Sequence, residues 1–125
     1  MSTVNVRYIV DDVDAAIEFY TTRLGFEVRM HPAPQFAILA RDALQLLLSA
    51  PSGAAGGGQV TEAGTPTPGG WNRISLVVDD LAGEVAALRA ARVHFRTDII
   101  NGVGGDQILL DDPSGNPVEL FQYRG

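Results

Sequence analysis

The sequence contains no cysteine. Disulfides, thiolate metal sites and cysteine nucleophiles are therefore excluded together, and the available chemistry rests on carboxylate, imidazole, hydroxyl and guanidinium groups. Basic residues are also few, because nine of them stand against fifteen acidic ones and give a formal net charge of -6. Binding to nucleic acid needs a basic face, so this charge argues against a nucleic-acid partner.

Long apolar runs are missing as well. No stretch is long enough to cross a bilayer, and the first residues lead straight into a strand pattern without a basic region or a cleavage site. We therefore expect no membrane partner and a cytoplasmic location. At 125 residues, of which 46% are apolar, the chain has the length and composition of one globular domain.

Residues 1–50 carry the pattern of a strand, an amphipathic helix and three short strands. Apolar and polar residues alternate over 4–10, which is typical of a strand with one apolar face. Asp12 suits a helix N-cap and Gly25 a helix end, with apolar residues at helical spacing between them. Three short runs follow, at 26–31, 36–40 and 44–49. The predicted unit is therefore βαβββ.

Residues 51–70 are rich in Gly, Ala, Thr and Pro and have no hydrophobic period. Such a segment in a compact domain is either a flexible connector or a loop that covers a ligand, and the sequence leaves both open. Beyond it the first pattern returns, with a strand at 73–78, a helix capped by Asp80 and a strand that begins at 93–96. We therefore predict one domain of two modules, 1–50 and 71–125, joined by the connector 51–70.

Two short matches support an internal duplication. Val10-Asp11-Asp12-Val13 returns as Val78-Asp79-Asp80-Leu81, and Leu44-Gln45-Leu46 returns as Val118-Glu119-Leu120. Repeated units of this kind are a primary clue to architecture. The two modules are therefore expected to share one topology.

A hairpin is predicted over residues 107–121. An apolar run enters a cluster of Asp, Pro, Ser, Gly and Asn and leaves as an alternating run, which indicates strand, turn and strand. In the returning strand Val118 and Leu120 point to one face, and Glu119 points to the other. A buried charge without a partner is costly, so we expect something to pair with Glu119. Asp111 and Asp112 are expected to form the turn.

Three motifs in order give the chain a family resemblance. They are Val-x-Asp before each helix, Phe19-Tyr20-x-x-x-Leu24-Gly25-Phe26, and Asp112-Pro113-x-Gly115-Asn116-x-x-Glu119-Leu120. Together they resemble the vicinal oxygen chelate superfamily, which includes glyoxalase I, bleomycin-resistance proteins, fosfomycin-resistance enzymes and extradiol dioxygenases. The resemblance covers essentially the whole chain. It implies an α+β fold, with two tandem βαβββ modules forming a curved sheet that carries the helices on its convex face, and it implies a homodimer.

The enzymes of this family build a metal site on the first and last strands of each module. The matching positions here are Asn5, Gln45, Arg73 and Glu119. A guanidinium has no lone pair to offer and the amides are weak ligands, so Glu119 would be the one strong ligand. A catalytic metal ordinarily needs about three protein ligands. We therefore expect no metal and no cofactor, and instead a salt bridge between Arg73 and Glu119.

Alternation places donors, acceptors and aromatic rings on the face away from the helices. The expected ligand-binding residues are Asn5, Arg7, Gln45, Leu47, Trp71, Arg73, Ser75, Glu119, Phe121 and Tyr123. Such a lining is typical of a small-molecule site, although a partner subunit could cover this face instead. Trp71 is expected either to stack on a flat ligand or to anchor the connector. Because two arginines outnumber one carboxylate here, we expect a ligand with an anionic group beside an aromatic or polycyclic body.

Three functions stay open. The first is a metal-independent protein that binds an aromatic or polycyclic compound, such as an antibiotic, like the bleomycin-resistance branch. The second is a glyoxalase-type lyase or dioxygenase that uses Glu119 as metal ligand or general base. The third is a structural or regulatory dimer without a small ligand. His31 and His94 lie outside the matching positions and are expected to be surface or structural residues.

Overall fold

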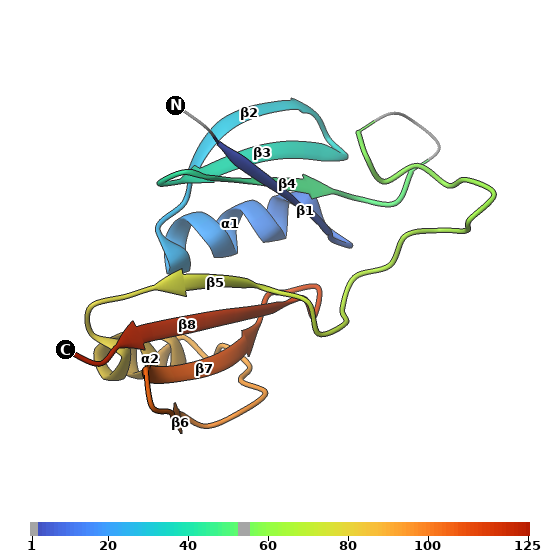
Figure 1. The fold of residues 1–125 in the computed structure, drawn as a ribbon. Coiled ribbons are helices and arrows are strands. Elements are labelled where there is room, and N and C mark those ends of the chain that lie inside the picture. The colour runs from blue at the N-terminus through green and yellow to red at the C-terminus, as the bar shows by residue number, and fades with distance from the viewer. Residues whose placement is uncertain (1–2, 53–55) are drawn as a thin grey trace. The chain divides into compact units, whose positions relative to one another are not determined.

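The computed structural model describes residues 3–52 and 56–125 (Figure 1). The chain divides into two compact units, Met1–Gly69 and Gly70–Gly125. Within the described residues, each unit contains one four-stranded sheet and one helix, and the strand orders are β1-β4-β3-β2 and β5-β8-β7-β6. The predicted α+β fold of two repeated modules is therefore confirmed.

The first module contains β1 (Val4–Ile9), α1 (Val13–Leu24), β2 (Glu27–Ala33), β3 (Phe36–Arg41) and β4 (Leu44–Ser49). β1 pairs in parallel with β4, and β3 pairs antiparallel with both β4 and β2. Helix α1 packs on β2, β3 and β4. Its Tyr20 is fully buried, as are Leu39 of β3 and Leu46 and Leu48 of β4. The core of this module therefore lies between α1 and one face of the sheet, and the other face is left open.

The second module contains β5 (Ile74–Val77), α2 (Leu81–Ala90), β6 (Ile100–Asn101), β7 (Gly105–Asp111) and β8 (Pro117–Tyr123). β8 pairs in parallel with β5 and antiparallel with β7. Val118 and Leu120 are fully buried, and Leu81, Val85 and Leu88 form the buried face of α2. The face of the second sheet that carries Glu119 is accordingly the open one.

Both helices begin at the predicted aspartates. The side chain of Asp12 accepts a hydrogen bond from the backbone N–H of Ala15 at 3.1 Å, and that of Asp80 accepts one from Gly83 at 3.0 Å. α1 is capped at its C-terminal end by Gly25, whose φ of 72° lies in the left-handed region that glycine adopts without steric cost. No helix of the described residues is long and apolar enough to span a membrane.

The predicted hairpin is also confirmed, and its turn is held by one aspartate. The Asp112 carboxylate accepts hydrogen bonds from the backbone N–H groups of Ser114 and Asn116, both at 2.9 Å, and from the Asn116 side chain at 3.1 Å. Gly115 adopts a φ of 84°, which a residue with a side chain would resist. The turn chemistry that the sequence displays therefore fixes the register of β7 and β8.

The strand expected to begin at 93–96 is wrong in extent. Phe95 forms an isolated bridge to Leu110, and regular pairing next to β7 resumes only in the two-residue β6. The pairing stops because the Thr97 hydroxyl accepts the hydrogen bond of the Leu109 N–H at 3.1 Å. A side chain thus takes the place of the next backbone acceptor.

Candidate functional site

The open face of the first sheet carries the expected site residues of the first module. β1 and β4 place Asn5 beside Gln45 and Arg7 beside Leu47. These four residues alternate with the buried residues of the same strands, so they share the face away from α1. The structure therefore brings them together as the sequence predicts.

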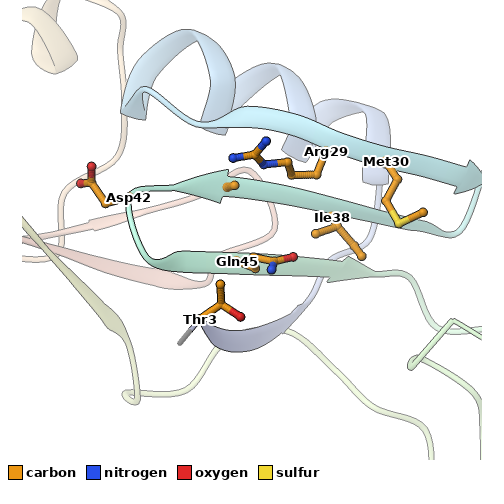
Figure 2. Close-up of a pocket in the computed structure, with 7 residues that line it drawn as sticks. Thr3, Arg29, Met30, Ile38, Asp42 and Gln45 are labelled. Atoms are coloured by element: carbon orange, nitrogen blue, oxygen red, sulfur yellow. The ribbon is translucent and has the colours of Figure 1, made fainter. Parts of the chain in front are cut away.

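A hollow of about 270 Å³ lies on this face. Its lining residues come from the chain before β1, from β2, β3 and β4, and from the turn between β3 and β4; they are Thr3, Arg29, Met30, Ile38, Ala40, Asp42 and Gln45 (Figure 2). Of the expected ligand-binding residues, Gln45 alone is in this lining. The hollow combines an apolar floor with a guanidinium, an amide and a carboxylate, which is the usual makeup of a small-molecule site.

The sequence did not predict Arg29 and Met30 as site residues, because β2 is irregular. β2 pairs Val28 with Leu39 and then Met30 with Ile38, so Arg29 is an extra residue in the ladder. Without this bulge, Met30 would point to the same face as Val28. Ile38 could have been predicted from the sequence. The alternation of residues 36–40 places it on the same face as Leu47 once β3 and β4 are paired.

The connector approaches the open face at Arg7. The Ser49 hydroxyl donates a hydrogen bond to the Gly56 carbonyl at 2.6 Å, and the Ser52 N–H donates one to the Gly58 carbonyl at 3.0 Å. The Gly57 backbone passes so close to Arg7 that a Cβ at position 57 would overlap the guanidinium. The connector therefore borders the Arg7 guanidinium on one side, while the residue as a whole remains exposed.

Gly58→Ala is expected to destabilise the protein by about 1–3 kcal/mol, because the added Cβ would overlap the carbonyl oxygen of Ala50, a backbone atom that cannot turn away. Urea unfolding measures the change. Gly104→Ala is the control, since a Cβ there meets no heavy atom within 4 Å. Equal midpoints for both variants would contradict the close packing of the connector.

In the second module, the expected salt bridge between Arg73 and Glu119 is confirmed. Nε and Nη2 of Arg73 donate to Oε1 of Glu119 at 3.2 and 3.0 Å. The Ser75 hydroxyl donates to the other carboxylate oxygen, Oε2, at 2.6 Å. Only 13% of the Glu119 side chain is exposed. Both oxygens of this carboxylate therefore accept hydrogen bonds, and its charge is compensated within the module.

This arrangement does not fit a metal at Glu119. A metal ion would have to displace both Arg73 and Ser75 from the carboxylate, and the guanidinium would then face the ion as a like charge. Within residues 3–52 and 56–125, no group of three or more His, Cys, Asp or Glu side chains is placed to hold a metal ion. The donor set of this chain thus differs from the one that the family's metal enzymes use.

Aromatic side chains extend the open face of the second sheet. β5 and β8 place Val77 beside Phe121. The rings of Phe121 and Tyr123 pack edge to face, with their centroids 4.9 Å apart. Val77 and Tyr123 are exposed, whereas Phe121 is half-buried above Gly105, where a Cβ would overlap its ring. This surface offers flat apolar contact beside the Arg73 and Glu119 pair.

Arg96 ties the beginning of the second module to its sheet. Its guanidinium donates to Asp111 at 2.7 Å, to the Gly70 carbonyl at 2.7 Å and to the Gly115 carbonyl at 2.9 Å. Its carbon Cζ also lies 4.7 Å from the centre of the Trp71 ring. Trp71 nevertheless remains 68% exposed, so stacking on a ligand stays a prediction for this residue.

Asp111 has a role that differs from the expected one. It lies at the end of β7, where its carboxylate accepts a hydrogen bond from Arg96 and contacts Nδ1 of His94 at 2.8 Å. The turn itself is formed by Asp112. His94 is largely exposed, as expected of a surface histidine, and His31 is exposed as well.

The fold and the duplicated strand order define the class of protein. A family model, the Glyoxalase/Bleomycin resistance protein/Dioxygenase superfamily, matches residues 3–120, and the chain belongs to this superfamily. The resemblance found in the sequence is therefore confirmed. None of the curated proteins compared with the chain matches it significantly.

Solved structures of the same fold include both enzymes and binding proteins. A superfamily member from Sphaerobacter thermophilus DSM 20745 is 26% identical, with a TM-score of 0.77 and coverage of 98% of this chain and 97% of that chain. Lactoylglutathione lyase from Agrobacterium tumefaciens is 21% identical, with a TM-score of 0.75 and coverage of 97% and 92%. TnmS3, an antibiotic binding protein from Streptomyces sp. CB03234, is 22% identical, with a TM-score of 0.74 and coverage of 99% and 97%. Because one fold carries both functions, the function of this chain has to be argued from its site.

Proposed function

We propose that the protein is a metal-independent binding protein for a small aromatic or polycyclic compound, such as an antibiotic. The observation that carries this proposal is the state of Glu119, whose two oxygens accept hydrogen bonds from Arg73 and Ser75. A carboxylate held in this way is a poor metal ligand and a poor general base, because each role needs an oxygen that faces the substrate or ion. Binding is the function that needs no such oxygen.

The hollow of the first module supports the proposal. Its volume of about 270 Å³ approaches the lower end of pockets that hold drug-sized ligands, which is about 300 Å³. Met30 is 51% exposed and contributes apolar surface to the lining with Ile38. A flat hydrocarbon body would cover this surface and remove it from water. The shared fold with the antibiotic binding protein TnmS3 agrees with such a role.

The other two hypotheses agree less well with this arrangement. A glyoxalase-type lyase or dioxygenase would need Glu119 released from Arg73, and a structural or regulatory dimer without a ligand would not account for the hollow. The contribution of the ten expected residues to ligand binding is part of the proposal. Pairing into a homodimer and a cytoplasmic location stay predictions from the sequence.

Met30→Gln is expected to weaken the binding of N-phenylnaphthylamine, a neutral aromatic dye, by about tenfold, because it places a polar amide against the bound ring. Fluorescence titration measures the dissociation constant. Val28→Gln is the matched control, since Val28 is a similarly exposed neighbour in β2 that pairs with the buried Leu39 and does not line the hollow.

The titration separates the proposal from its alternatives. Loss of affinity in Met30→Gln with an unchanged Val28→Gln supports binding in the hollow. If the wild-type protein does not bind the dye, or if both variants bind it as the wild type does, the hollow is not the ligand site and the proposal fails.

A further inference from the structure

We propose that Arg29 binds the anionic group of the ligand, and that the preferred ligand is an aromatic acid with a single negative charge. This inference rests on the proposed function and names the residue that recognises the charge of the ligand. It differs from the sequence-based expectation, in which Arg7 and Arg73 bind the anion.

Arg29 lies where an apolar hollow meets a polar one. It lines the hollow that contains Met30 and Ile38, and it also lines a second hollow of about 430 Å³. The second hollow is lined by Gly25, Glu27, Arg29, Ala40, Arg41 and Asp42. In Figure 2 the Arg29 side chain extends along the sheet toward the end where Asp42 lies, and Met30 lies at the opposite end. A ligand whose ring covers Met30 would thus present a polar end to Arg29.

The bulge of β2 creates this arrangement. Because Arg29 is the extra residue between Val28 and Met30, an arginine and an apolar side chain stand next to each other on one face. In a regular strand, neighbours point to opposite faces. Bulges recur where a strand redirects a side chain toward a site.

Arg73 and Arg7, the arginines that the sequence assigns to the anion, already contact a carboxylate and an aromatic ring, and Arg41 lines the polar hollow but not the apolar one. All nine basic residues are arginines, and four of them, Arg73, Arg89, Arg96 and Arg124, form ion pairs with carboxylates. Arg7 lies over the Phe36 ring and under Gly57. Within residues 3–52 and 56–125, Arg29 has no carboxylate within salt-bridge distance, so its guanidinium is available to a ligand.

The surrounding carboxylates limit the charge of the ligand. Glu27 and Asp42 balance Arg29 and Arg41 in the second hollow, so an incoming anion gains from direct contact with one arginine but meets no excess of positive charge. Asp42 also lines the apolar hollow from the turn between β3 and β4. A second negative charge on the ligand would be repelled by these carboxylates. A single charge is therefore favoured.

Arg29→Gln is expected to weaken the binding of anilinonaphthalene sulfonate, which is flat and singly charged, by about tenfold. The dissociation constant of the same variant for the neutral N-phenylnaphthylamine is expected to change by less than about twofold, because the apolar contacts remain. Arg23→Gln, which removes an exposed arginine in the last turn of α1, is the control and is expected to leave both constants unchanged. Asp42→Asn is expected to strengthen sulfonate binding, since it removes a like charge.

The two dyes distinguish the two proposals. If Arg29→Gln weakens both dyes equally, or leaves sulfonate binding unchanged, Arg29 does not bind the anionic group and this inference is overturned while binding in the hollow stands. If the neutral dye does not bind the wild-type protein, the proposed function itself fails. Opposite effects of Arg29→Gln and Asp42→Asn on the sulfonate, without an effect on the neutral dye, would support charge recognition by Arg29.

Discussion

Arg96→Lys is expected to lower the free energy of unfolding of the protein by about 2–3 kcal/mol, although the positive charge is kept. Lysine has three donors on one nitrogen, whereas Arg96 donates in three directions, to Asp111 and to the carbonyls of Gly70 and Gly115. The Asp111 side chain is only 15% exposed. A lysine would therefore leave at least one of these three acceptors without its donor.

Trp71 supplies the measurement for Arg96→Lys. It is the only tryptophan of the sequence, and the guanidinium of Arg96 lies on its ring. Its emission is expected to change in the folded variant, and a urea transition followed by this emission gives the loss of stability. Arg92→Lys, at an exposed arginine next to the end of α2, is the control and is expected to stay within about 0.5 kcal/mol of the wild type. An Arg96→Lys midpoint equal to that of the wild type would show that the three hydrogen bonds contribute little.

The second large effect is expected at the Arg73 and Glu119 pair. Arg73→Met is expected to destabilise the protein by about 1–3 kcal/mol, because it leaves a carboxylate that is 13% exposed with Ser75 as its remaining donor. Glu119→Met added to Arg73→Met is expected to restore part of this loss, since it removes the uncompensated charge. The coupling energy between the two positions follows from urea unfolding of the single and double variants.

A more exposed ion pair serves as the comparison for this cycle. Arg124 contacts Asp106, and the two side chains are 52% and 30% exposed. Arg124→Met is expected to cost less than about 1 kcal/mol, as surface pairs generally do. If Arg73→Met costs no more than Arg124→Met, the pair does not hold Glu119, and the argument against a metal or a general base at this residue loses its basis.

The sequence predicts those features that local chemistry encodes. Asp12 and Asp80 cap their helices because the aspartate side chain reaches the third residue on, which is a contact within one turn. The turn at Asp112 depends on residues within five positions of it. The pair of Arg73 and Glu119 is more distant, yet the family resemblance implied it, because the family's metal site places these two positions on the first and last strands of one module, which pair with each other here.

The features that sequence reasoning missed depend on tertiary contacts. The bulge at Arg29 comes from the pairing of β2 with β3, and alternation alone cannot show an extra residue in the ladder. The hydrogen bonds of Arg96 span residues 70 to 115, and no short motif marks them. The approach of Gly57 to Arg7 joins the connector backbone to a side chain of β1 fifty residues earlier, and a glycine in a glycine-rich segment gives no sign of it.

Native mass spectrometry decides whether the protein binds an aromatic compound without a metal. The protein is isolated under nondenaturing conditions, exposed to nickel, zinc and manganese, and then exposed to anilinonaphthalene sulfonate. The same spectrum counts subunits and so tests the predicted homodimer. We expect each chain to bind the aromatic probe and to retain no stoichiometric divalent ion, because Arg73 occupies the Glu119 carboxylate. One divalent ion per chain that is lost in Glu119→Gln would contradict the account and would favour the lyase or dioxygenase hypothesis.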